Sequence, residues 1–110
     1  MEWKALNNEA DLDALVAQSF QKPQLIFKHS TRCSISSMAL NRMERAETPN
    51  SIDFYLLDLL QHRSLSQKIA DQFQVYHESP QVLLVQKGEC VYDESHQGIQ
   101  MDEILSQLNP

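Results

Sequence analysis

The sequence predicts an α/β domain in which a mixed β-sheet is covered by helices on both faces. Short, nearly continuous apolar segments alternate with segments whose apolar residues recur at three-four spacing, as buried strands alternate with amphipathic helices. The last two strand-like segments are separated only by a few residues around Lys87-Gly88, so they must be antiparallel neighbours. The predicted order of elements is β-α-β-α-β-α-β-β-α, with the earlier strands, which are separated by helices, parallel.

The composition suits one ordinary domain. At 110 residues and 42% hydrophobic content the chain is long enough to bury a core, so we expect residues 1–110 to form a single domain. The net charge of -6, with basic residues scattered, offers no basic surface for nucleic acid or for a membrane. The start of the chain does not resemble a leader, and no apolar run approaches the ~20 residues that span a bilayer, so a cytoplasmic location is expected.

Four elements are expected in the N-terminal half. A short strand lies around residues 3–6, and Asn8 can cap a helix that Pro23 ends. The inward face of this helix is expected to consist of Leu12, Leu15, Val16 and Phe20. Leu25 to Lys28 reads as a buried strand, and a second helix follows Cys33. Its expected inward residues are Ile35, Met38, Ala39, Arg42, Met43 and Ala46.

The C-terminal half continues the alternation. Residues 52–59 predict a buried strand, and Ser64 with Gln67 predicts a capping box at the start of a helix. The expected inward residues of that helix are Leu65, Ile69, Ala70 and Phe73. Ser79-Pro80 breaks the chain before a strand over residues 82–85, which turns at Lys87-Gly88 into a strand around Val91. A last helix is expected to turn inward Met101, Ile104, Leu105 and Leu108.

Cys33 is the candidate nucleophile. It stands between a strand and a helix, where unpaired backbone N–H groups favour the ionised thiolate that attacks disulfides. Its polar neighbours Thr31, Arg32, Ser34 and Ser36 add donors and a cation, whereas an inert core cysteine has apolar neighbours. The alternative, a half-exposed cysteine without a role, fits the same pattern.

A second cysteine within reach of Cys33 is missing. Ser36 occupies the position of the second cysteine in a Cys-x-x-Cys pair, so a mixed disulfide at Cys33 has to be released by a thiol from outside. Five residues at ~3.3 Å each place Cys90 roughly 15 Å from the Pro80 end of its hairpin, beyond disulfide reach if Cys33 packs beside Pro80. We therefore interpret Cys90 as a structural residue.

The arrangement of Cys33 and Pro80 resembles that of the thioredoxin superfamily, in which a proline before a strand is cis and faces the reactive sulfur. Residues 27–36 (FKHSTRCSIS) and 77–84 (HESPQVLL) are similar to the YtxJ-type monothiol bacilliredoxin family, and the similarity covers nearly the whole chain. The resemblance implies a thioredoxin-like fold in which Cys33 takes bacillithiol from S-bacillithiolated client proteins onto itself. Free thiol or a thiol reductase would then restore Cys33. Many relatives have proline directly after the cysteine, where this chain has Ser34.

The resemblance also suggests a substrate-binding region around Cys33. Ser79 and Pro80 would supply backbone pairing and room beside the sulfur. Antiparallel pairing brings His96 back toward Pro80, where it could bind the carboxylates of a small thiol or assist proton transfer. Arg32 could attract an anionic substrate, and His29 could tune Cys33, although both also fit surface residues without a role.

No bound cofactor and no metal are expected, because one accessible thiolate cannot supply the four ligands of an iron–sulfur cluster. Two other functions remain open at this stage. The domain could be an adaptor that holds a peptide beside Pro80 without turnover, or Cys33 could be a peroxide-sensing thiol.

Overall fold

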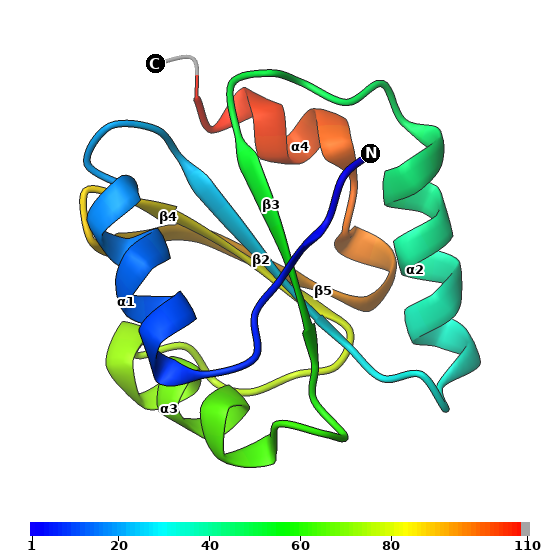
Figure 1. Ribbon diagram of the computed structural model, residues 1–110. Coiled ribbons are helices and arrows are strands. Elements are labelled where there is room, and N and C mark those ends of the chain that lie inside the picture. The colour runs from blue at the N-terminus through cyan, green and yellow to red at the C-terminus, as the bar shows by residue number, and fades with distance from the viewer. Residues whose placement is uncertain (109–110) are drawn as a thin grey trace.

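The computed structural model describes residues 1–108, and its five strands form one mixed sheet in the order β1-β3-β2-β4-β5 (Figure 1). The strands are β1 (Lys4–Ala5), β2 (Gln24–His29), β3 (Asp53–Asp58), β4 (Gln81–Gln86) and β5 (Glu89–Ser95). Strands β1, β2 and β3 are parallel, β4 runs antiparallel to β2, and β5 runs antiparallel to β4. The expected order of elements and the mixed sheet are confirmed, while residues 109–110 of the expected domain lie outside the described residues.

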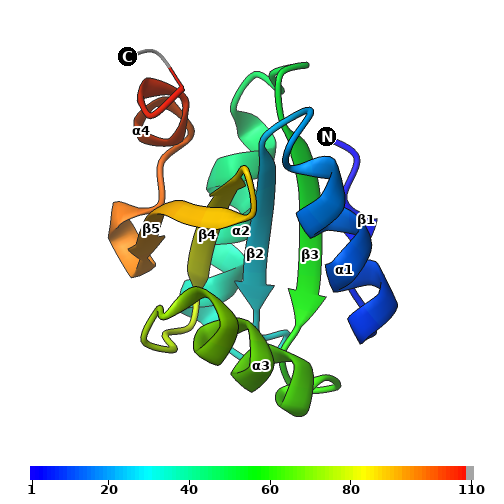
Figure 2. The same ribbon diagram turned by 90° about the vertical axis from the view of Figure 1, so that its left-hand side faces the viewer.

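Helices cover both faces of the sheet (Figure 2). The helices are α1 (Glu9–Gln18), α2 (Ser34–Arg45), α3 (Arg63–Phe73) and α4 (Met101–Ser106), and a short 3-10 turn, η1 (His96–Gly98), precedes α4. Alternate residues of β2 face the two cores, because side chains along a strand point to opposite faces. Leu25 and Phe27 pack with α2 and α4, whereas Ile26 packs with α1 and α3.

Helix α1 begins as expected and ends earlier than expected. The Asn8 side-chain oxygen accepts a hydrogen bond from the Asp11 N–H at 2.8 Å, which satisfies one of the unpaired donors at the helix start. The helix ends at Gln18, so Phe20 lies beyond it. Phe20 is 60% exposed and rests beside Gly88, and its expected inward orientation was wrong.

The inward face of α2 differs from the expected one. The fully buried residues of α2 are Ser36, Ala39 and Met43. Ile35 and Met38 are 51% and 63% exposed, and Arg42 and Ala46 are half-buried. The buried set also obeys three-four spacing, and burying Ser36 is possible because its hydroxyl has partners in the preceding loop.

Helix α3 begins one residue before the expected capping box. His62 is the N-cap residue and makes no side-chain cap hydrogen bond, while Ser64 lies inside the first turn. The capping box was therefore wrong, and the Gln67 amide donates instead to Asp71 Oδ1 at 3.0 Å. The buried residues of α3 include the expected Leu65, Ile69 and Ala70.

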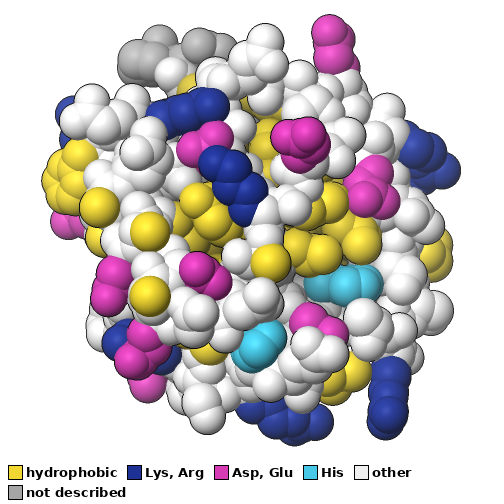
Figure 3. All heavy atoms as spheres, in the orientation of Figure 1, with side chains coloured by type: hydrophobic (Ala, Val, Ile, Leu, Met, Phe, Trp, Pro, Cys, Tyr) yellow, Lys and Arg dark blue, Asp and Glu magenta, His cyan; other side chains and the backbone are white. Residues whose placement is uncertain are grey.

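The hairpin of β4 and β5 returns the chain to the end of the sheet where β4 begins. Lys87 and Gly88 form its turn, both with positive φ, and the register pairs Gln81 with Ser95. The His96 N–H donates to the Pro80 carbonyl at 3.1 Å, so the expected return of this segment to Pro80 is confirmed. Within residues 1–108 every helix is too short or too polar to cross a membrane. On the face shown in Figure 3, basic and acidic side chains are interspersed.

Candidate active site

Cys33 stands at the junction of β2 and α2. A turn after His29 is closed by the Cys33 N–H, which donates to the Ser30 carbonyl at 3.2 Å. Cys33 is the N-cap residue of α2, with extended backbone (φ −109°, ψ 119°), and its carbonyl accepts the Ser37 N–H at 3.0 Å. The cysteine is free and half-exposed, beside the first N–H groups of the helix. The expected position of Cys33 at a helix start is confirmed.

Pro80 lies at the same end of the sheet. The Ser79–Pro80 peptide bond is cis, as expected, and Pro80 is buried directly before β4. The antiparallel register pairs Lys28 with Gln81, so one further step along each strand places His29 opposite Pro80, just before the Cys33 turn. The Ser79 hydroxyl is buried and has no hydrogen-bond partner among residues 1–108.

Ser36 fixes the loop that carries Cys33. Its hydroxyl accepts the Ser30 N–H at 3.0 Å and lies 2.6 Å from His29 Nδ1, and all three residues are buried. Burial lowers the pKa of His29 below its usual value, against the opposing charges of Asp58 and Glu44. The hydroxyl at the position of a resolving cysteine thus has a structural task, which is to join the start of α2 to the end of β2.

Cys90 lies far from this loop. It pairs with Val85 in the β4–β5 hairpin, near the turn, whereas Pro80 precedes the opposite end of β4. Its Sγ lies 3.4 Å from the Tyr92 carbonyl oxygen. Burial raises the pKa of the Cys90 thiol to about 11, so it is almost entirely un-ionised at neutral pH. These features agree with a structural interpretation of Cys90.

The family model described as monothiol bacilliredoxin BrxC matches residues 4–104. The chain belongs to the monothiol bacilliredoxin family. A solved structure described as a candidate oxidoreductase with a thioredoxin fold has a TM-score of 0.84 and 28% identity, over 96% of this chain and 92% of that chain. Thioredoxins from Fasciola hepatica (TM-score 0.72, 16% identity, 96% and 95% covered) and Malassezia sympodialis (0.75, 13%, 96% and 86%) share the fold.

These comparisons establish that this bacilliredoxin family member has the thioredoxin fold that the Cys33 and Pro80 motifs implied. They also support thiol oxidoreductase chemistry.

The other expected site residues of this family member differ in exposure. Thr31, Arg32 and Ser34 are exposed around Cys33, whereas Ser36 is fully buried. His96 adopts a positive φ of 55°, and its Nε2 lies 3.8 Å from Glu78 Oε2. The structure therefore gathers the Cys33 loop, Pro80 and His96 at one end of the sheet.

Arg42 joins α2 to the segment that carries His96 through hydrogen bonds that the sequence did not predict. Its guanidinium Nη2 donates to the His96 carbonyl at 3.0 Å and its Nε to the Ile99 carbonyl at 2.8 Å. These bonds connect the last turn of α2 to η1 and to the residue that follows it. Its inward position was predicted from apolar spacing, but no pattern in the sequence indicated these partners.

Lys28 is the second residue that the sequence missed. It is fully buried, and its Nζ donates to the Ser66 carbonyl at 3.2 Å and lies 3.3 Å from His77 Nδ1. Burial lowers the pKa of Lys28 to about 8. The signal that could have revealed it is the alternation of strand side chains, since Lys28 shares a face with the buried Ile26.

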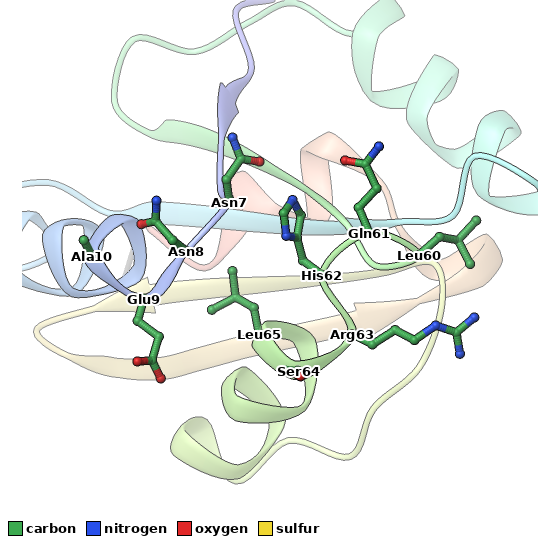
Figure 4. A pocket seen from close by; sticks show the side chains of 10 residues that line it. All are labelled: Asn7, Asn8, Glu9, Ala10, Leu60, Gln61, His62, Arg63, Ser64 and Leu65. Carbon is green, nitrogen blue, oxygen red and sulfur yellow. The ribbon is translucent and has the colours of Figure 1, made fainter.

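A hollow of about 750 Å³ lies between the starts of α1 and α3 (Figure 4). Neither Cys33 nor Pro80 lines it, so it is separate from the cysteine site. Within residues 1–108 the structure brings together no group of three or more histidine, cysteine, aspartate or glutamate side chains that could hold a metal ion.

Proposed function

We propose that the protein is a monothiol thiol–disulfide exchange enzyme that removes bacillithiol, or a similar low-molecular-weight thiol, from mixed disulfides on client proteins. The observation that carries this proposal is the half-exposed free Cys33 at the start of α2, in a chain of the monothiol bacilliredoxin family. No bound cofactor is needed, because the small thiol is a co-substrate.

The proposed reaction is two exchanges at sulfur. The Cys33 thiolate attacks the bacillithiol sulfur of the client mixed disulfide, a Cys33–bacillithiol disulfide forms, and the client thiolate leaves and takes a proton from water. A second bacillithiol thiolate, or a thiol reductase, then attacks the bacillithiol sulfur of this adduct and releases Cys33 as a thiolate. Each step breaks one disulfide and forms one, so no electrons are lost or gained overall within a step.

The positions of Ser36 and Cys90 support release of the adduct by a thiol from outside the protein. Ser36 offers a hydroxyl that is occupied by Ser30 and His29, and Cys90 lies near the far end of β4 with its thiol protonated. Neither can attack a disulfide at Cys33. The adduct at Cys33 is therefore the species that should accumulate when the outside thiol is scarce.

Substrate contacts are proposed for the groups at the same end of the sheet. Ser79 and Pro80 would pair with the backbone of the client beside the sulfur, and the buried Ser79 hydroxyl would gain a partner there. Thr31, Arg32 and Ser34 would border the bound thiol because they are exposed next to Cys33. His96 would also border this region, because its backbone N–H donates to the Pro80 carbonyl, and its ring faces Glu78.

The proposal is tested by mass spectrometry after incubation with bacillithiol disulfide and, in parallel, with glutathione disulfide. We expect rapid addition of one bacillithiol to the wild type and to Cys90→Ser, much slower addition of glutathione, and no addition to Cys33→Ser. If the wild type gains no adduct from either disulfide, or if Cys90→Ser loses the adduct as fully as Cys33→Ser, the proposed function is wrong.

A further inference from the structure

A second polar site lies beside the cysteine loop, on the α3 side of the sheet. A cavity of about 190 Å³ is lined by Leu59, Arg63, Ser66, Gln67 and His77. The Leu59 N–H donates to the carbonyl of His29 at 3.0 Å, which joins the cavity wall to the end of β2 just before the Cys33 turn. His77 belongs to the segment that leads directly into the cis Ser79–Pro80 bond. Both links lead from the cavity wall to the end of the sheet that carries Cys33 and Pro80.

The buried Lys28 determines how His77 presents its ring to this cavity. Lys28 Nζ and the Ser66 hydroxyl both lie 3.3 Å from His77 Nδ1. A protonated amine has donors only, so Nδ1 must accept and the ring proton must reside on Nε2. Burial, together with the Lys28 charge, lowers the pKa of His77, against an opposing effect of Glu78. The exposed ring of His77 is thus held neutral, with its Nε2–H free to donate outward.

The cationic groups at the cavity have no carboxylate partner. None of the ion pairs found among residues 1–108 includes Arg63 or Lys28. Glu78, the acidic neighbour of His77 in the chain, faces His96 at 3.8 Å instead. In Figure 4 the Arg63 side chain points away from the other labelled side chains, toward the side of the loop that joins α3 to β4. The cavity wall thus combines the Arg63 guanidinium with the His77 imidazole, and the buried Lys28 ammonium contacts His77 from within the core.

We propose that this cavity is a carboxylate subsite for the low-molecular-weight thiol whose sulfur bonds to Cys33. Arg63 binds the carboxylate from the exposed side, His77 Nε2–H donates to it, and the buried Lys28 keeps His77 in the donating tautomer. A guanidinium and an N–H donor are the groups that recognise a carboxylate in water-accessible sites. This inference rests on the proposed function and adds to it the residues that would hold the carboxylate of the small thiol.

The test compares two small disulfides with the same carbon chain between sulfur and end group, the dianionic 3,3′-dithiodipropionate and its uncharged dimethyl ester. Their second-order rates of adduct formation at Cys33 are measured by mass spectrometry for the wild type and for Arg63→Gln. Removing Arg63 should slow the dicarboxylate by about fivefold and leave the ester unchanged, since one charge-assisted contact is lost at a partly exposed site. Arg45→Gln, an equal loss of charge in the last turn of α2, is the control and should leave both rates unchanged.

Two further variants separate the roles of the cavity side chains. His77→Gln retains an N–H donor and should keep most of the preference for the dicarboxylate, whereas His77→Leu should lose it. A uniform loss for both probes in Arg63→Gln, or no change in either, would overturn the subsite and leave the proposed function standing. If Cys33 in the wild type reacts with neither probe and also with no bacillithiol disulfide, the proposed function fails first and the subsite fails with it.

Discussion

Replacing Ser36 with alanine should destabilise the protein far more than a serine-to-alanine change elsewhere on α2. Ser36 is fully buried, and its hydroxyl is the partner of the Ser30 N–H and of His29 Nδ1. Alanine removes the hydroxyl without opening a path for water to either group. Two buried polar groups would therefore lose their partner at once.

The magnitude follows from those two contacts. A buried donor or acceptor that is left without a partner costs about 1–3 kcal/mol, and alanine returns a few tenths of a kcal/mol through its higher helix propensity. The free energy of unfolding should fall by about 3 kcal/mol. For a chain of this length that corresponds to a decrease in Tm of about 13 °C.

The measurement is thermal unfolding followed by circular dichroism at pH 7, with Ser37→Ala as the matched control. Ser37 is the next residue of the same helix turn, is half-buried, and takes no part in the two hydrogen bonds. Its replacement should change Tm by no more than about 2 °C. Equal changes in the two variants, or a Ser36→Ala protein as stable as the wild type, would refute the structural role of this hydroxyl.

Three further predictions concern the titratable groups. The pKa of Lys28 is about 8 when folded and 10.5 when unfolded, so the unfolded state binds more protons between these values. In urea unfolding, the free energy of unfolding of the wild type should therefore rise by about 1.3 kcal/mol from pH 7 to pH 9, relative to that of Lys28→Met. Burial also lowers the pKa of His29, so stability should decrease as pH falls below about 6.5, and His29→Gln should lose less between pH 7 and pH 5. Iodoacetamide at pH 7 should label Cys33 at least about a hundredfold faster than Cys90, whose thiol has a pKa of about 11, and comparable rates would contradict the assignment.

The order of elements was predictable because it depends on patterns that are local in the sequence. Asn8 precedes a helix and caps it, and Pro80 precedes an apolar strand and lies directly before β4. The short Lys87-Gly88 connection forces an antiparallel hairpin whatever the rest of the chain does. These features require no knowledge of contacts between distant residues.

The face that α2 buries was not predictable in the same way. Two sets of residues on this helix obey three-four spacing, and both contain Ala39 and Met43. They differ because the buried face includes Ser36, whereas the more apolar Ile35 and Met38 are exposed. What decides between them is whether Ser36 can be buried at low cost. That depends on the backbone of Ser30 and on the ring of His29, which come into reach only after β2 and α2 have packed together.

The burial of Lys28 could not be predicted from the sequence for a related reason. A lysine at the end of a strand is usually exposed, and its acceptors here come from α3 and from the loop before Pro80, which lie far along the chain. The cis bond before Pro80, by contrast, was expected from the resemblance to the thioredoxin superfamily, because Pro80 stands directly before an apolar strand. Residues whose role depends on distant partners, such as Lys28, become visible only in the folded structure.

The positions of the two cysteines explain why the proposed reaction needs an outside thiol to complete it. Cys33 ends the turn that follows β2, whereas Cys90 pairs with Val85 near the other end of β4, about 15 Å from Pro80 at ~3.3 Å per strand residue. Two cysteines form a disulfide only when their Cα atoms lie within about 7 Å. Since Ser36 has no sulfur either, an adduct at Cys33 persists until a second thiolate arrives. The lifetime of the adduct should therefore be inversely proportional to the concentration of that thiol.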